Sequence, residues 1–240
     1  MSKDTLIELS DINKIYYMGE NKLQVLFDIC LQIYENDFVS IVGPSGSGKT
    51  TLLNIMACLD PPTSGEYKLK GMDVISKSND DKSEIRSESI GFIFQSFNLI
   101  SRHTAIENVE MPLVYSSVYN RQDRKDRAME CLEMVELTDR ANHFPNELSG
   151  GQQQRVAIAR ALINNPDIIL ADEPTGNLDS RTSEGIIKLL KNLHTSGKTI
   201  IVITHNNDIA KETMDTVSYT HLRAHETLRY HVCRLLLEKK

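Results

Sequence analysis

Apolar residues follow two different spacings along the chain, and the two spacings alternate. Near the start, apolar and polar positions alternate in short runs such as residues 6–9 and 26–29, which predict β-strands at a mixed sheet edge. Residues 38–42 are almost wholly apolar, as is typical of a buried strand. Asn36 and Asp37 indicate a turn just before that strand.

The middle of the chain changes from strand-like to helical spacing. Residues 66–70 are expected to form an edge strand and residues 89–94 an interior strand. From about residue 104 to 139, apolar positions lie three or four residues apart with charged residues between them, which indicates helices with a solvated face. The apolar positions of this pattern include Ala128, Cys131, Leu132, Val135 and Leu137. A further helix is expected to begin near Ser149.

The last part of the pattern restores an alternation of strand and helix. Residues 168–171 predict a strand, residues 182–193 a helix and residues 199–203 another strand. Such alternation implies parallel strands joined by crossover helices. The expected fold class is therefore α/β, with a mostly parallel sheet, an antiparallel β edge subdomain and an inserted α-helical subdomain.

Composition narrows the possible functions. The 240 residues are 40% hydrophobic and carry a net charge of −6, so a large core is expected and nucleic acid is not an expected partner. The first residues lack the apolar run of a signal peptide, and no run approaches the ~18 apolar residues that span a bilayer. The chain is expected to be cytoplasmic, and a membrane role would need a partner chain. The four cysteines show no C-x-x-C spacing, so reduced thiols are expected, three of them filling core space.

Residues 43–50, Gly-Pro-Ser-Gly-Ser-Gly-Lys-Thr, match the pattern G-x-x-x-x-G-K-[ST] directly after the strand at 38–42. In this pattern, backbone N–H groups surround phosphate oxygens, the lysine adds a positive charge and the hydroxyl can ligate Mg²⁺. An ordinary Gly/Ser-rich turn is the alternative, but a helix expected over residues 51–58 favours a nucleoside triphosphate site. The expected nucleotide contacts are Gly43, Ser45, Gly46, Ser47, Gly48, Lys49, Thr50 and Thr51, with Thr50 also a metal ligand.

The strand at 168–171 ends in two adjacent carboxylates, Asp172 and Glu173. Asp172 has the position of a Walker-B aspartate and is expected to orient Mg²⁺. Glu173 is expected to accept a proton from the water that attacks the γ-phosphate. The alternative is a polar turn that ends a buried strand at Pro174.

Residues 148–152, Leu-Ser-Gly-Gly-Gln, precede these acids by about twenty positions and resemble the signature loop of ABC ATPases. Without that resemblance the loop is a helix N-terminus, either a second anion cradle or a cap with a flexible lead-in. The resemblance implies that two copies of the chain pair head to tail, so that the signature of one copy closes on ATP held by the other. The residues implied are Ser149, Gly150, Gly151 and Gln152.

Other positions match the same family one at a time. Tyr16 resembles the aromatic residue that stacks on adenine, although Tyr17 is a rival and Tyr16 could equally pack at a strand edge. Gln95 resembles the Q-loop glutamine that links Mg²⁺ to the partner, or it simply ends a strand. Residues 177–179 resemble the D-loop, and His205 resembles the histidine that contacts the γ-phosphate.

Within the family, the motifs most resemble ATP-binding subunits of the lipoprotein-release and macrolide-export type. That resemblance implies an ATPase coupled to transport, bound to a transmembrane permease at the inner face of the membrane. It places the permease contact at residues 97–112, where Leu99, Ile100 and Met111 would suit an apolar contact or would instead form a local helical core. The alternative function is a regulatory ABC ATPase of the cell-division type.

The expected domains are an ATP-binding core with the β edge at residues 1–94 and 155–216, and a helical signature subdomain at 95–154. Residues 217–240 depart from the family pattern and are expected to be a non-native tail. A metal site is the less favoured interpretation of that tail. It would use His221, His225, His231 and Cys233.

Overall fold

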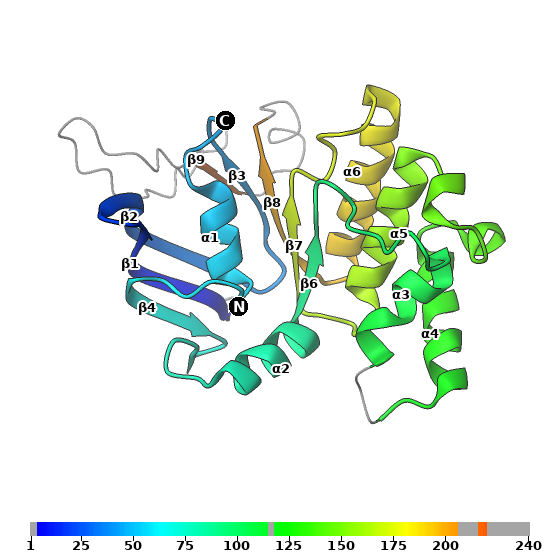
Figure 1. The fold of residues 1–240 in the computed structure, drawn as a ribbon, viewed down its shortest axis with the longest axis horizontal. Helices are drawn as coiled ribbons and strands as arrows, with labels where there is room; N and C mark the ends of the chain where they lie inside the picture. Colours follow the sequence, from blue (N-terminus) through cyan, green and yellow to red (C-terminus); the bar gives the residue numbers. More distant parts are fainter. Residues whose placement is uncertain (1–3, 115–117, 206–215, 220–240) are drawn as a thin grey trace, which may run out of the picture. The chain divides into compact units, whose positions relative to one another are not determined.

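The computed structural model describes residues 4–114, 118–205 and 216–219. The chain forms two compact units, which Figure 1 shows coloured by sequence. The first unit combines Met1–Lys82 with Ile203–Lys240, and the second is Ser83–Val202. The expected α/β class is confirmed, since the chain contains both antiparallel and parallel strand pairs as well as helices.

An antiparallel sheet of four strands lies in the first unit. Its two long strands, β1 (Thr5–Met18) and β2 (Asn21–Tyr34), each have 14 residues, where the sequence predicted only short runs. The pairing of β1 with β2 changes register at several points, for example between positions Leu9 and Ile12 of β1. Each such irregularity changes which side chains face the core, so the apolar–polar alternation in the sequence breaks there. The predicted edge strand is β4 (Ser64–Leu69), and that prediction was wrong because β4 lies between β1 and the two-residue β5 (Met72–Asp73).

The buried strand and the helix after it carry the phosphate-loop sequence. Strand β3 (Phe38–Val42) is buried at every position, as its apolar sequence predicts, and it pairs in parallel with β9 (Thr216–Tyr219). Helix α1 (Lys49–Met56) buries Leu52, Leu53, Ile55 and Met56 in the core of this unit. The buried Tyr67 of β4 donates its hydroxyl to the carbonyl of Met56 at 2.7 Å, so the far end of α1 is tied to the antiparallel sheet.

The second unit contains the other predicted strands and the helical segment. Strand β6 (Ile90–Ile93) pairs in parallel with β7 (Ile168–Asp172). The prediction that β6 would be an interior strand was wrong, because among the described residues it is the terminal strand of its sheet. Helix α3 (Ala105–Val114) packs against α4 (Arg121–Met134) and α5 (Gly150–Leu162), and α5 also contacts β6 and α6 (Ser180–Thr195). The periodic apolar positions predicted for this segment, from Ala128 to Leu137, are buried. The remaining helices of this unit are η1 (Thr138–Arg140) and η2 (Pro145–Glu147). Strand β8 (Thr199–Thr204) begins in this unit, which ends at Val202.

Helix α2 (Asn79–Ser89) was not predicted. None of its residues is buried, so it has no apolar face whose spacing could reveal it. Its N-terminus carries a local signal: the Ser78 hydroxyl accepts the backbone N–H of Asp81 at 3.1 Å, and the Asp81 carboxylate accepts the N–H of Ser78 at 3.1 Å. This reciprocal pair is a capping box, and its S-x-x-D sequence could have indicated the helix start.

The structure places two of the three described cysteines in the core. Cys58 and Cys131 are buried, whereas Cys30 is exposed, and Cys233 lies outside the described residues. In residues 4–114 and 118–205, no helix is long and apolar enough to cross a membrane. The histidines proposed as alternative metal ligands, His221, His225 and His231, also lie outside the described residues.

Candidate nucleotide-binding site

The phosphate loop turns from β3 into α1 with its charged side chain folded inward. Lys49 is 6% exposed, and its Nζ donates to the carbonyl oxygens of Gly43 at 2.8 Å and Pro44 at 2.9 Å. Ser47 is also buried, and its Oγ has no partner in the described part of the chain. A buried hydroxyl without a partner is costly unless a ligand supplies one. A lysine held by two carbonyls and a buried hydroxyl donor therefore fit phosphate oxygens.

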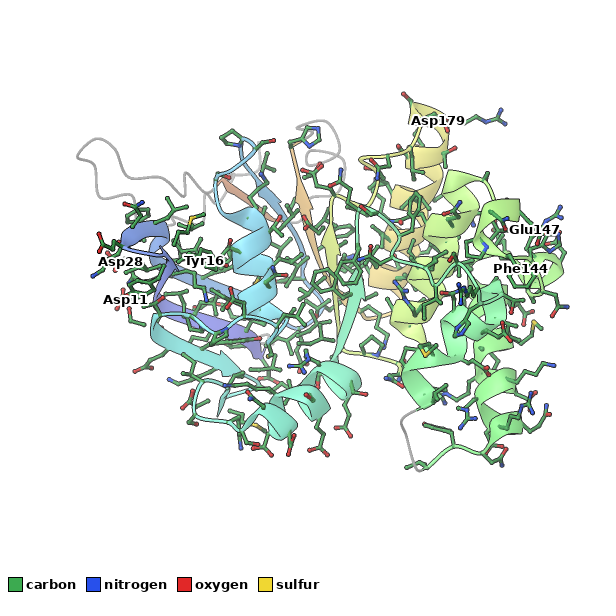
Figure 2. All side chains as sticks on the ribbon, viewed as in Figure 1. Asp11, Tyr16, Asp28, Phe144, Glu147 and Asp179 are labelled. Carbon is green, nitrogen blue, oxygen red and sulfur yellow. The ribbon has the colours of Figure 1, made fainter. Side chains whose placement is uncertain are left out.

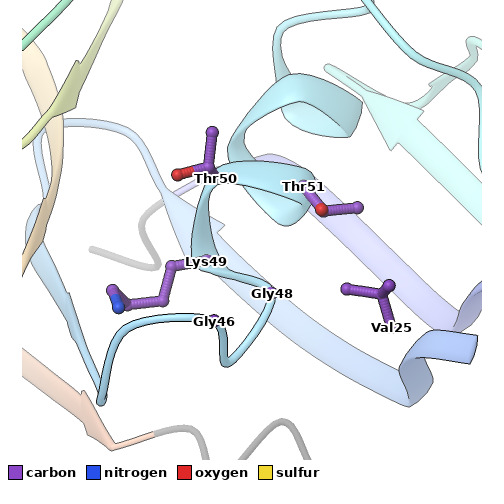
Figure 3. Close-up of a pocket in the computed structure, with 6 residues that line it drawn as sticks. All are labelled: Val25, Gly46, Gly48, Lys49, Thr50 and Thr51. Atoms are coloured by element: carbon purple, nitrogen blue, oxygen red, sulfur yellow. The ribbon is translucent and has the colours of Figure 1, made fainter.

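A pocket of about 190 Å³ opens at the start of α1 (Figure 3). It is lined by Val25, Gly46, Gly48, Lys49, Thr50 and Thr51. Gly48 caps α1 with φ of 93°, and a Cβ atom there would come within 2.9 Å of the Leu26 side chain. Glycine is therefore needed both for the left-handed backbone and for the close approach of β2. The helix N-terminus faces this pocket and favours a negatively charged ligand.

The two candidate tyrosines for adenine stacking differ in their surroundings. The Tyr16 hydroxyl donates to the Asp60 carboxylate at 2.7 Å, and Lys14 Nζ lies 5.0 Å from the centre of its ring (Figure 2). Burial and the Asp60 carboxylate raise the pKa of the Tyr16 hydroxyl. A hydrogen bond with Thr51 lowers this pKa by less, so the pKa is raised overall. Because Thr51 lines the pocket, Tyr16 is next to it. Tyr17 is 63% exposed and contacts Lys22 instead.

The second unit holds the predicted acids and the Q-loop glutamine. Asp172 ends β7 and is half-buried, and the half-buried Glu173 follows it with φ of 49°, in the left-handed region. A turn starts there, in which the N–H of Gly176 donates to the Glu173 carbonyl at 3.0 Å. Asn177 Nδ2 donates to the backbone carbonyl of Gln95 at 3.0 Å. The structure thus brings the Q-loop glutamine together with the turn that follows the acids.

The signature sequence forms the N-terminus of α5. Ser149 is the N-cap: its Oγ accepts the N–H of Gln152 at 3.3 Å, and Gln152 Oε1 accepts the N–H of Ser149 at 2.9 Å. Gly150 and Gly151 are the first residues of the helix. A Cβ atom on Gly151 would come within 2.3 Å of the Thr182 methyl group, so this position needs glycine.

The D-loop sequence leads into α6. Asp179 caps this helix, accepting the Thr182 N–H at 3.0 Å and the Thr182 hydroxyl at 2.6 Å (Figure 2). These hydrogen bonds lower the pKa of the Asp179 carboxyl. The same Thr182 contacts the signature glycine, so the signature and the D-loop are held together within one copy of the chain. His205 is exposed and follows β8, in the first unit.

Sequence reasoning missed four residues that support these groups. Asp60 and Lys14 fix Tyr16, Thr182 contacts the signature, and Gln154 of α5 bonds to the turn after Glu173. Gln154 had a detectable signal, because it lies three and four residues before Ala157 and Ile158, on the apolar face of the predicted helix. Asp60 and Thr182 lie far in sequence from the residues that they support, and Lys14, although only two residues from Tyr16, acts through its contact with the distant Asp60.

The family comparison agrees with this geometry. Residues 26–176 match the ABC transporter family, so the chain belongs to that family. An uncharacterized ABC transporter ATP-binding protein of Thermotoga maritima is 52% identical over 207 residues, covering 86% of this chain and 88% of that protein. A similarly described protein of Methanocaldococcus jannaschii, MJ0796, is 54% identical over 210 residues, covering 86% and 89%. The chain is the ATP-hydrolysing, nucleotide-binding subunit of an ABC transporter, as the motifs predicted.

Two further comparisons bear on the branch and on the fold. The macrolide export ATP-binding/permease protein MacB of Aggregatibacter actinomycetemcomitans is 50% identical over 205 residues, covering 85% of this chain but 32% of that protein. The predicted resemblance to the macrolide-export type is confirmed. A solved dimeric structure of MJ0796 with ADP and phosphate is similar with a TM-score of 0.82 and 50% identity, covering 89% of this chain and 94% of that chain.

Proposed function

We propose that two copies of this chain close head to tail on ATP and that hydrolysis reopens them to drive a permease. The similar MJ0796 chains form dimers, one of them in a post-hydrolysis state, which supports pairing of this chain as well. The observation that carries the proposal is the presence of two separate helix N-termini suited to phosphate, one at the phosphate loop and one at Ser149. We infer that both helix N-termini serve the same nucleotide, with the phosphate loop supplied by one copy of the chain and the Ser149 N-terminus by the other.

The phosphate loop binds the triphosphate. Lys49 exchanges the carbonyls of Gly43 and Pro44 for phosphate oxygens, and the buried Ser47 hydroxyl gains an acceptor. Tyr16 stacks on the adenine, held in place by Asp60. Ser149 and the glycines after it close on the γ-phosphate of the nucleotide bound to the partner copy.

The carboxylates support hydrolysis. Mg²⁺, when bound, neutralises charge on the β- and γ-phosphates. Thr50 is an exposed residue in the first turn of α1 whose hydroxyl would ligate Mg²⁺, while Asp172 would orient the ion and Gln95 would contribute from the Q-loop. Glu173 accepts a proton from the attacking water, and His205 contacts the γ-phosphate.

The permease contact is proposed at residues 97–112 of the second unit. Ile100 is 41% exposed, whereas Leu99 and Met111 are half-buried, so the surface and the local core share these apolar side chains. MacB carries permease and ATP-binding functions in one protein, which supports a permease partner for this chain. Binding to that permease would place the chain at the inner face of the cell membrane.

The test uses Glu173→Gln, with Lys49→Ala as the comparison. Glu173→Gln is expected to bind ATP, to slow hydrolysis by about 10²–10⁴-fold, and to shift from monomer to dimer with Mg²⁺-ATP in size-exclusion chromatography with light scattering. Lys49→Ala is expected to bind ATP more weakly and to remain monomeric. Normal turnover in Glu173→Gln would exclude the assigned role of this carboxylate. ATP binding without dimerisation would argue against the paired-site mechanism.

A further inference from the structure

The buried amide of Gln154 is not explained by packing. Gln154 is fully buried at 0% exposure in α5, on the helix face that it shares with the buried Ala157 and Ile158 three and four residues further on. Its Nε2 donates to the carbonyl oxygen of Pro174 at 2.8 Å, while its Oε1 has no partner in the described part of the chain. Because a carbonyl can only accept, the amide nitrogen must face Pro174 and the oxygen is left unpaired. An apolar side chain of the same length would avoid burying that oxygen.

The backbone that this hydrogen bond holds is the one that presents Glu173. Glu173 has φ of 49°, which side chains other than glycine rarely adopt, and the proline after it restricts its backbone further. Such a conformation persists only when neighbouring contacts impose it. Two hydrogen bonds do so here: Gly176 N–H to the Glu173 carbonyl at 3.0 Å, and Gln154 to the next carbonyl along.

We propose that Gln154 is a positioning residue for ATP hydrolysis, which holds Glu173 in place through the Pro174 carbonyl. The inference rests on the proposed role of Glu173. The Gln154 side chain links the helix that begins at the signature Ser149 to the turn that carries the Glu173 carboxylate, within one copy of the chain. Gln154 contacts neither ATP nor water in this role; it acts through the backbone.

Gln154→Met tests the proposal in the full chain, because methionine has a similar length and removes both the donor and the unpaired oxygen. The expected result is a decrease in kcat of about 10- to 100-fold, with KM for ATP within about two-fold of wild type. Two effects on Tm oppose each other, because the orphaned oxygen is gone but the buried Pro174 carbonyl loses its donor, so kcat is compared per folded molecule. A residue with only a structural role would lower Tm and leave kcat per folded molecule unchanged.

Asn164→Leu is the matched control. The Asn164 amide donates to the Ser87 carbonyl at 2.8 Å, so the variant also removes an amide-to-carbonyl bond in the second unit, at a site without a predicted catalytic residue. Its kcat is expected to stay within about two-fold of wild type. Equal losses of kcat in both variants, or an unchanged kcat in Gln154→Met, would overturn the proposal.

The double variant with Glu173→Gln separates this inference from the proposed function. If Gln154 acts through Glu173, adding Gln154→Met to Glu173→Gln leaves the residual single-turnover rate unchanged; multiplied effects would overturn the proposal. Normal hydrolysis in Glu173→Gln alone would refute the role of Glu173 itself. Slow hydrolysis there with normal hydrolysis in Gln154→Met would refute only the inference.

Gln154→Glu serves if the methionine variant does not fold. A glutamate buried at this position has a raised pKa, and only its protonated form donates to the Pro174 carbonyl. Its kcat relative to wild type is therefore expected to rise as the pH falls. A ratio that does not change with pH would count against the proposal.

Discussion

Tyr16 shows how a single side chain acquires a role from its neighbours. Tyr16 and Tyr17 are adjacent in sequence, but only Tyr16 donates a hydrogen bond to Asp60 and lies beside the pocket residue Thr51. Tyr17 is exposed and contacts Lys22. The alternation of side chains along a strand sends the two rings to opposite faces. The choice between them therefore depends on which face of β1 meets α1.

Replacing each tyrosine in turn tests this assignment. Tyr16→Ala is expected to weaken ATP binding by about tenfold, because stacking of a base on an aromatic ring contributes about 1–3 kcal/mol. Tyr17→Ala is expected to leave the Kd within about two-fold. Titration with a fluorescent ATP analogue measures both, and a larger loss in Tyr17→Ala would reverse the assignment.

Helix α6 shows how an element depends on its cap. Asp179 accepts two hydrogen bonds from Thr182, which lower the pKa of its carboxyl below the ordinary value of 3.8. A carboxyl whose pKa is lower in the folded than in the unfolded state stabilises the fold at pH values above its unfolded-state pKa. That stabilisation is lost as the pH falls from 3.8 through the lowered value.

Asp179→Asn should therefore change the pH dependence of stability. Asparagine keeps the capping oxygen but does not titrate in this range, so the wild type should lose stability relative to the variant below about pH 4. Urea unfolding at pH 7 and at several acidic values measures the difference. Parallel curves for the two proteins would show that the Asp179 charge does not contribute to capping α6.

Strand β9 bears on the predicted non-native tail. The tail was predicted to begin at residue 217, which falls inside β9, and β9 pairs with the strand that leads into the phosphate loop. A chain that ends at Tyr219 is expected to keep ATP binding within about two-fold. A chain that ends at Asp215 loses the β9 pairing, and its Tm is expected to fall by about 5–10 °C. Loss of ATP binding in the chain that ends at Asp215 would contradict the prediction that residues 217–240 are a non-native tail.

At the scale of the whole molecule, the proposed mechanism makes each ATP site from two copies. Lys49→Ala damages the phosphate loop, and Ser149→Arg damages the signature at an exposed residue. Each variant alone is expected to be inactive. A mixed dimer would contain one site with an intact Lys49 from one copy and an intact Ser149 from the other.

An equal mixture of these two variants should recover ATPase activity. Half of the dimers are mixed and each has one intact site, so about a quarter of the wild-type rate is expected if the sites turn over independently. Phosphate release measures the rate, and the separate variants at the same total concentration are the controls. No recovery, although the mixture forms mixed dimers with Mg²⁺-ATP, would show that one copy supplies its own site.

The domain division is also a whole-molecule question. The sequence predicted a helical subdomain at residues 95–154, inserted into the ATP-binding core, and these boundaries remain a prediction. The compact units divide near residues 82 and 202, so α3, α4 and α5 belong to the same unit as β6 and β7. Contacts of α5 with both α3 and β6 explain this, because they join the helical segment to the strands on either side of it in sequence.

The sequence alone determined the parts of this protein that consist of neighbouring residues. Spacing along the chain predicted β3, β7, β8 and most helices, and the phosphate loop, the paired acids and the signature were visible because each is a contiguous motif. It missed α2, which has no buried face, and it shortened β1 and β2, where irregular pairing breaks the alternation. Only the tertiary structure decided which residues support the site. The contacts of Asp60 with Tyr16 and of Gln154 with Pro174 join positions 44 and 20 residues apart, and burial at such distances depends on how the elements pack.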